Sequence, residues 1–162
     1  MNPFAALSPV PYENLYHMGI VVPEMDAAMT ELSEQMGLTW APPRVFPVNM
    51  REGGAIRSYG VKATYSREGP PYFELMEAVG ETIWSAGYAG QLHHIGVYAE
   101  DAQKEIARLE ATGFTVEAQG LTPKGEPLGP TYLTNRFGLR IELGSATGRE
   151  MIADWVSTPE ER

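Results

Sequence analysis

Two histidines and two glutamates occupy matching positions in two similar halves of this 162-residue chain. His17 stands in the segment YHMGIVV and His94 in HHIGVYA, whereas Glu74 and Glu142 lie inside YFELMEA and RIELGSA. Two imidazoles and two carboxylates are a suitable ligand set for one divalent ion such as nickel, cobalt, zinc, manganese or iron(II). The four residues therefore predict a metal site, provided that the fold brings them together.

The segments around the two histidines form an internal repeat. Alignment of HMGIVVPEMDAAMTELSEQMGLTW with HIGVYAEDAQKEIARLEATGFTV places His17 on His94 and Gly19 on Gly96, an offset of 94 − 17 = 77 residues. Each copy has the pattern of a strand, a turn, a helix, a glycine that ends the helix, and further strands. We therefore predict an α+β fold of two βαβββ modules.

Residue parity gives each candidate ligand its own side of a strand. Side chains alternate across a strand, so the apolar Met18 and Ile20 point away from His17. The same alternation separates the other three candidate ligands from the apolar residues of their strands. If the two copies pair about a pseudo-twofold axis, the four ligands converge in one concave site. His93 lies on the opposite face from His94, and we expect it to be a packed residue or an outer support of the site.

The repeat also predicts the organisation of the chain as one structural domain. The first module is expected at residues 13–79, a linker at 80–90, the second module at 91–146, and a C-terminal helix and tail at 147–162. In the first helix an apolar stripe with helical spacing is expected to be buried, and it comprises Met25, Ala28, Met29, Leu32 and Met36.

Composition excludes several classes of partner. The formal net charge is −9, which disfavours binding to nucleic acid or to anionic membranes. Cysteine is absent, and we find neither a secretion leader nor an apolar run near the length of a membrane span. We therefore expect a cytoplasmic protein with a small-molecule substrate. Three tryptophans and the C-terminal helix are compatible with a homodimer interface as well as with the core.

Candidate substrate-binding residues follow from the same parity. Arg57, Tyr59 and Val61 share one face of the segment AIRSYGVKATYS, which would line the concave site. Tyr98 shares the face of His94. Arg57, Tyr59 and Tyr98 are therefore expected to contact the substrate, with Arg57 suited to an anionic end.

The quoted motifs, together with LHHIGVYAED, resemble the strands of the vicinal oxygen chelate superfamily from about Tyr16 to Gly144. This superfamily includes glyoxalase I, methylmalonyl-CoA epimerase, extradiol dioxygenases and the bleomycin- and fosfomycin-resistance proteins. The resemblance implies paired βαβββ modules that form a cup-shaped, curved mixed sheet with the helices outside and one divalent ion inside. Carried over by motif, the metal ligands are His17, Glu74, His94 and Glu142.

The resemblance also implies an activity. The chain is expected to be a metal-dependent isomerase or lyase that removes a proton next to a metal-coordinated carbonyl of a small substrate or thioester, with Glu142 as the base and Glu74 as the alternative. The epimerases use a second carboxylate from the first module, for which the nearest acid here is Glu52, in a glycine-rich segment. The alternatives are a non-catalytic protein that binds a drug or aromatic ligand, and an iron(II) extradiol dioxygenase, for which a fourth protein ligand would occupy a position that oxygen chemistry needs.

Overall fold

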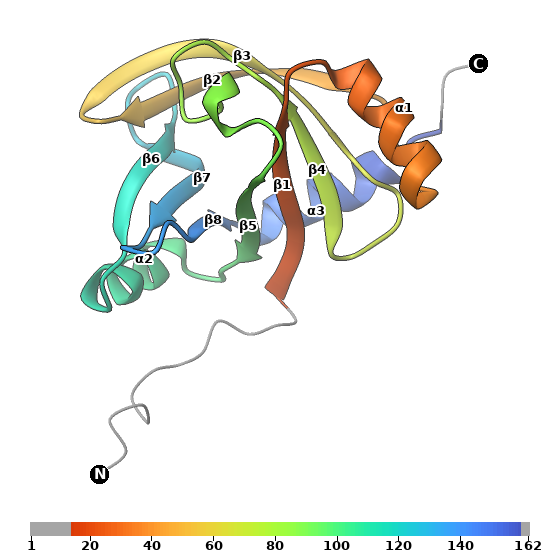
Figure 1. The fold of residues 1–162 in the computed structure, drawn as a ribbon. Coiled ribbons are helices and arrows are strands. Elements are labelled where there is room, and N and C mark those ends of the chain that lie inside the picture. Colours follow the sequence, from red (N-terminus) through yellow and green to blue (C-terminus); the bar gives the residue numbers. More distant parts are fainter. Residues whose placement is uncertain (1–13, 160–162) are drawn as a thin grey trace.

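The order strand, helix and three strands occurs twice in the computed structural model, which describes residues 14–159 (Figure 1). The first copy comprises β1 (Leu15–Val22), α1 (Met25–Met36), β2 (Arg44–Glu52), β3 (Ala55–Tyr65) and β4 (Tyr72–Glu77). The second comprises β5 (Leu92–Tyr98), α2 (Ala102–Ala111), β6 (Thr115–Leu121), β7 (Pro127–Thr134) and β8 (Arg140–Gly144). A 3-10 turn, η2 (Ala86–Tyr88), lies between the copies, and α3 (Ala146–Val156) follows β8. The predicted α+β fold of two βαβββ modules is confirmed; residue 13 and residues 160–162, which the predicted boundaries include, lie outside the described residues.

The eight described strands form one mixed sheet in the order β1-β4-β3-β2-β6-β7-β8-β5, and this sheet is closed. Within each module the first and last strands of the sequence are neighbours in the sheet and run parallel, β1 with β4 and β5 with β8. The modules meet antiparallel at two places, β1 with β5 and β2 with β6. The second junction closes the expected cup into a barrel, because residues 49–52 of β2 pair with residues 118–121 of β6 and leave no free backbone edge there.

The helices cover the outside of the barrel and bury the apolar side of the ligand-bearing strands (Figure 1). Under α1, Met25 packs with Leu75 of β4. Under α2, a matching cluster contains Ile106, Leu109, Ile141 and Leu143, together with Val97 and Leu133. Both clusters lie on the strand faces that parity assigned to the core, because each helix needs an apolar surface on which to bury its own stripe.

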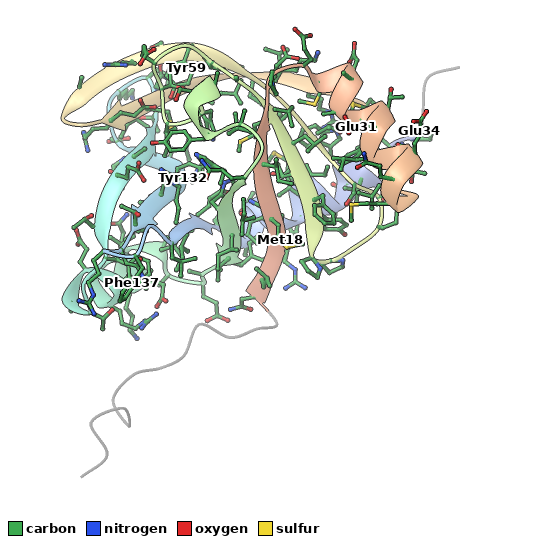
Figure 2. All side chains as sticks on the ribbon, viewed as in Figure 1. Met18, Glu31, Glu34, Tyr59, Tyr132 and Phe137 are labelled. Atoms are coloured by element: carbon green, nitrogen blue, oxygen red, sulfur yellow. The ribbon has the colours of Figure 1, made fainter. Side chains whose placement is uncertain are left out.

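The exposed side of α1 is polar, with Glu31 and Glu34 directed outward (Figure 2). The helix ends at Gly37, which adopts the left-handed conformation (φ 71°) and donates its N–H to the Ser33 carbonyl. The predicted buried stripe was wrong at its last member. Met25 is fully buried and Ala28, Met29 and Leu32 are partly buried, whereas Met36, the last residue of the helix, is 54% exposed.

The C-terminal helix α3 contributes to the interior of the barrel. Its Ile152 and Trp155 are buried in an apolar cluster inside the barrel. This cluster also contains Met50, Val61, Met76 and, from the inter-module segment, Trp84. The Trp155 indole N–H donates to the Pro42 carbonyl at 2.8 Å. Since Trp40, Trp84 and Trp155 are all at most 5% exposed, core packing accounts for the three tryptophans within one chain. Within residues 14–159, no helix has the length and the apolar character needed to cross a membrane.

Arg67 anchors the end of α3, and its removal should destabilise the fold. Its guanidinium donates to the carbonyls of Val156 at 2.6 Å and Thr158 at 2.7 Å, and to that of Trp40 at 3.0 Å. Because hydrogen bonds from a charged donor are individually strong, we expect Arg67→Ala to lower the free energy of unfolding by about 2 kcal/mol in urea titrations. Arg108→Ala, which removes an ion pair within α2, is the control and should cost less than about 1 kcal/mol. Equal losses in the two variants would contradict this anchoring role.

Candidate metal centre

Four buried side chains from four different strands meet inside the barrel. They are His17 on β1, Glu74 on β4, His94 on β5 and Glu142 on β8, and each is at most 7% exposed. One ligand atom from each residue lies within 4.8 Å of the ligand atoms of the other three. The fold thus brings together the four residues that parity had selected.

Three of the five distances between ligand atoms in the cluster match those of atoms that share one ion, and the other two lie within about 0.3 Å of that range. The two histidine Nε2 atoms lie 2.7 Å apart, and the Glu74 Oε2 atom is 3.3 Å from Nε2 of His17 and 3.1 Å from that of His94. The Glu142 Oε2 atom lies 3.7 and 3.2 Å from the same two nitrogens. Ligand atoms about 2.1 Å from a common ion are separated by roughly 3 to 3.4 Å.

Unpartnered atoms supply a second test of fit. Glu74 Oε2 is buried and has no hydrogen-bond partner in the described structure, although a buried carboxylate oxygen is normally satisfied. The set of two nitrogen and two oxygen donors also suits a borderline divalent ion. These residues therefore fit a divalent metal, and they would hold it through His17 Nε2, His94 Nε2 and the two carboxylates.

The repeated glycines make room for the histidines. In the antiparallel ladder of β1 and β5, Gly19 lies opposite His94 and Gly96 lies opposite His17. A Cβ atom on Gly19 would lie 2.0 Å from Cε1 of His94, and one on Gly96 would lie 2.3 Å from Cε1 of His17. Each imidazole therefore occupies the space above the glycine of the other copy, which explains why the His-x-Gly sequence occurs twice.

Three buried tyrosines hold the glutamates. Tyr65 lies directly opposite Glu74 in the β3–β4 ladder and donates its hydroxyl to Glu74 Oε1. Tyr132 lies opposite Glu142 in the β7–β8 ladder and donates to Glu142 Oε2 at 2.5 Å. Tyr16 donates to Glu142 Oε1 at 2.8 Å. Burial, with the nearby carboxylates, raises the pKa of each of these phenols well above 10, so they remain neutral hydrogen-bond donors.

Sequence reasoning missed these tyrosines. A signal for two of them was present in the repeat, because Tyr65 and Tyr132 precede their glutamates by 9 and 10 residues. Only a strand register, however, places them opposite the glutamates.

The two copies differ at the position before the histidine. The 77-residue offset pairs Tyr16 with His93, since 16 + 77 = 93, and His93 does not bind a glutamate. The Nε2–H of His93 donates to the Ile83 carbonyl at 2.8 Å. The Nδ1 atom of His93 is therefore unprotonated, and it accepts a hydrogen bond from the Nδ1–H of His94 at a nitrogen–nitrogen distance of 2.9 Å. This tautomer directs the Nε2 lone pair of His94 into the cluster. Burial, assisted by His94 and Arg140, lowers the pKa of His93 to about 3 and keeps its imidazole neutral.

The electrostatics of the metal-free cluster assign one proton to the two ligand histidines. Burial lowers the pKa of His17. Burial acts in the same direction on His94, but hydrogen bonds and attraction from Glu142 and Glu74 outweigh it and raise the pKa of His94 to about 9. Burial alone would raise the pKa of Glu142, yet the two histidines lower it below its ordinary value. At neutral pH the proton on His94 therefore occupies the place of a cation between two carboxylates.

A cavity of about 550 Å³ borders Glu74 and Glu142, and the predicted substrate-binding residues Arg57, Tyr59 and Tyr98 do not line it. Arg57 is exposed and donates to the Glu81 carbonyl at 2.7 Å, and Tyr59 donates to Glu52. Tyr98 lies behind Tyr16, with the two rings stacked at a centroid distance of 3.7 Å. Figure 2 shows Tyr59 by the long β2–β3 hairpin and Tyr132 in the interior.

The reason lies in the inter-module segment. Val61, on the face shared by Arg57 and Tyr59, does line the cavity, as does Ala63. Arg57 and Tyr59 instead contact the inter-module segment, Arg57 through the Glu81 carbonyl and Tyr59 edge-to-face with Trp84 at a centroid distance of 5.9 Å. Parity thus identified the correct face of β3, but not how much of that face borders the cavity.

Comparison with known proteins supplies a family and a set of similar folds. Residues 16–129 match the family model described as Glyoxalase/Bleomycin resistance protein/Dioxygenase superfamily. No curated protein matches the chain.

Among solved structures, methylmalonyl-CoA epimerase from Mycobacterium tuberculosis is 15% identical, with a TM-score of 0.55 over 87% of this chain and 93% of that chain. A variant of methylmalonyl-CoA epimerase from Streptomyces coelicolor, in complex with 2-nitronate-propionyl-CoA, is 17% identical, with a TM-score of 0.57 over 90% and 98% of the two chains. A hypothetical protein from Bacillus halodurans C-125 is 17% identical, with a TM-score of 0.55 over 91% and 97%. At these identities the likeness concerns the fold alone.

The contact between each glycine and the opposite histidine can be tested directly. Gly19→Ala or Gly96→Ala should displace one imidazole and weaken cobalt(II) binding about tenfold or more, a loss of the size seen when the support of a metal ligand is removed. Gly60→Ala is the matched control, because an added Cβ on this strand glycine would meet only Val45 Cγ1, at 3.3 Å. Binding would be measured by the visible absorption of cobalt(II), with folding checked by circular dichroism. Wild-type affinity in both site variants would refute the steric explanation.

Metal affinity should increase with pH up to about 9. His94 is protonated below its pKa of about 9, and an ion must displace that proton to reach Nε2. The apparent affinity for cobalt(II) should therefore fall by roughly tenfold for each pH unit below 9 and become level above it. Isothermal titration calorimetry in buffers of different ionisation enthalpy would also detect about one proton released per ion near pH 7. An affinity that stays constant from pH 6 to 8.5 would show that His94 is not protonated in the metal-free protein.

Proposed function

The chain belongs to the glyoxalase, bleomycin resistance protein and dioxygenase superfamily, and from this premise we propose that it is a divalent-metal-dependent isomerase or lyase. In this proposal it removes a proton from the carbon next to a carbonyl group of a small substrate. The observation that carries the proposal is the buried cluster of two histidines and two glutamates beside a cavity of about 550 Å³. When bound there, a divalent ion would polarise the carbonyl and offset the negative charge that develops on proton removal.

The hydrogen bonds favour Glu74 over Glu142 as the base, in contrast to the order expected from the sequence. Both oxygens of Glu142 accept a tyrosine hydroxyl, one from Tyr16 and the other from Tyr132. Glu74 accepts one tyrosine hydroxyl, from Tyr65 on Oε1, and its Oε2 faces the two candidate histidine ligands. A ligand carboxylate that takes a proton from carbon would have to turn one oxygen away from the ion, and Glu74, which is held by one hydroxyl instead of two, is the freer to do so. We therefore assign this step to Glu74 and the fixed ligand role to Glu142.

A single carboxylate suffices for an isomerase that removes a proton and returns it to a neighbouring atom. A two-base epimerase needs a second acid on the opposite side of the substrate, and the nearest acid expected from the sequence, Glu52, is at the end of β2. Glu52 accepts the Tyr59 hydroxyl and does not line the cavity. These contacts support one-base chemistry more than two-base epimerisation.

Non-catalytic binding of a drug-like or aromatic ligand is the second candidate, because the cavity is mostly apolar. Such binding does not require a buried cluster of charged groups, which is costly to desolvate. The cluster therefore favours the enzyme. The iron(II) dioxygenase remains third, since four protein ligands leave less room for oxygen and substrate. A homodimer and a cytoplasmic location remain predictions from the sequence and its resemblance.

Proton exchange in deuterated water tests the reaction without knowledge of the natural substrate. The zinc- or cobalt-loaded protein would be incubated with α-hydroxyacetophenone, other α-hydroxyketones and α-substituted thioesters, and deuterium incorporation would be followed by mass spectrometry. We expect wild-type exchange to depend on the metal and Glu74→Gln to reduce it by about 10² to 10³-fold, the usual contribution of a general base. Metal content must be measured in each variant, because Gln retains an oxygen ligand.

Glu142→Gln is the matched variant on the other copy, and it should reduce exchange less than Glu74→Gln. The reverse order would move the base to Glu142. A metal-loaded wild type that exchanges none of these compounds would instead support the ligand-binding protein.

A further inference from the structure

The cavity beside the metal centre lacks a cationic side chain in the described part of the chain. The charged residues that line it are the two candidate ligands Glu74 and Glu142. With two neutral imidazoles, two carboxylates and a divalent ion, the loaded cluster carries no net charge. An anionic group of a substrate would therefore find no cationic side chain in this cavity to pair with, and burying it there would be unfavourable.

Aromatic and apolar side chains form most of the cavity wall. Trp155 packs edge-to-face on Phe46 and on Tyr65, with ring centroids 5.2 and 5.1 Å apart. Trp84 packs in the same way on Tyr132, at 5.6 Å. Tyr65 and Tyr132 donate hydrogen bonds to the two glutamates. Each tryptophan therefore packs on a tyrosine that itself contacts a candidate metal ligand.

The entrance of the cavity has the same character. Leu128 of β7 and Met151 of α3 both line the cavity, and they are 63% and 50% exposed. Exposed apolar side chains that continue into an apolar cavity provide a path for an uncharged molecule rather than for a charged one.

Besides Glu74 Oε2, one further polar atom in this wall lacks a hydrogen-bond partner among the described residues. Trp84 is 3% exposed, and its indole N–H has no hydrogen-bond acceptor among the described residues. The other two tryptophan N–H groups are satisfied, that of Trp155 by the Pro42 carbonyl and that of Trp40 by the Met29 carbonyl. A buried donor without an acceptor is rare in a folded protein, and its acceptor is then an ordered water or a ligand oxygen that takes the place of that water.

We infer that the substrate is a compact, uncharged molecule with an aromatic or other apolar body, and that Trp84 donates a hydrogen bond to one of its oxygen atoms. The inference rests on the proposed carbonyl chemistry and specifies its substrate class. A cavity of about 550 Å³ is within the range of small-molecule sites, and it encloses a molecule of one or two rings. Polyanionic carriers such as coenzyme A thioesters are disfavoured, and Arg57, expected to hold an anionic end, lies outside the cavity.

Two ligands that differ only in charge test the substrate class. α-Hydroxyacetophenone is neutral, and its 4-carboxylate derivative has an anionic group at the end of the ring away from the carbonyl. Calorimetric titration of the full-length, zinc-loaded protein should give at least about tenfold tighter binding of the neutral compound. Propionyl-CoA should bind more weakly than the neutral compound as well. Equal or tighter binding of either anionic compound would overturn the inference.

The role of Trp84 needs its own variant and control. Trp84→Phe removes the N–H and should weaken binding of α-hydroxyacetophenone about fivefold, the effect of one net hydrogen bond. Trp155→Phe removes the same atoms from the other cavity tryptophan, whose N–H bonds to the Pro42 carbonyl and not to a ligand, so it controls for the smaller ring and for support lost within the protein. An equal loss in both variants would show that Trp84 contributes only its shape.

These binding ratios separate the inference from the proposed function. If the protein binds no divalent ion or catalyses no exchange, the enzyme assignment fails, whereas the preference for neutral ligands is still measured. If exchange depends on the metal but the anionic ligands bind best, the reaction stands and the substrate class is wrong.

Discussion

The antiparallel pairing of β1 with β5 is the contact on which the rest of the site depends. It joins the two copies about a pseudo-twofold axis and places each histidine over the glycine of the opposite strand. His17 and His94 reach each other only because Gly19 and Gly96 have no side chain. The parallel partners β4 and β8 then bring the two glutamates to the same place. A slip of one residue in this ladder would turn the imidazole of the shifted strand to the other face of the sheet, away from its partner.

Burial makes this cluster costly without a cation and well suited to one. Two carboxylates and two imidazoles lie almost without solvent, where unpaired charge is strongly disfavoured. Three tyrosine hydroxyls satisfy three of the four carboxylate oxygens, and the raised pKa of His94 retains a proton in the metal-free protein. The barrel wall, the outer helices and α3 exclude water around this centre. The same exclusion strengthens every electrostatic interaction that a substrate would meet there.

Duplication supplied the symmetry of the site, and departure from symmetry supplies a direction for chemistry. Tyr65 and Tyr132 each donate one hydroxyl to the glutamate of their own module. Tyr16 and His93 hold corresponding positions in the two copies, but only Tyr16 binds a glutamate. Tyr16 donates a second hydroxyl to Glu142, whereas His93 contacts His94, so that Glu74 accepts a single tyrosine hydroxyl. The inter-module segment and α3 add a further difference, since each contributes one tryptophan, and only the Trp84 N–H lacks an acceptor among the described residues.

The sequence by itself determined the two modules, the four candidate ligands and the faces on which they lie. Repetition and strand alternation are local properties, so the offset of His17 and His94 and the parity of Glu74 and Glu142 could be read directly. The tertiary structure decided what depends on distant pairing. The register of β3 with β4 and of β7 with β8 set the tyrosines against the glutamates, and the β2–β6 junction closed the barrel. It also excluded Arg57 from the cavity, where Arg57 contacts the inter-module segment instead, and brought Trp84 of that segment into the cavity wall, because the path of a linker is not encoded in the alternation of neighbouring residues.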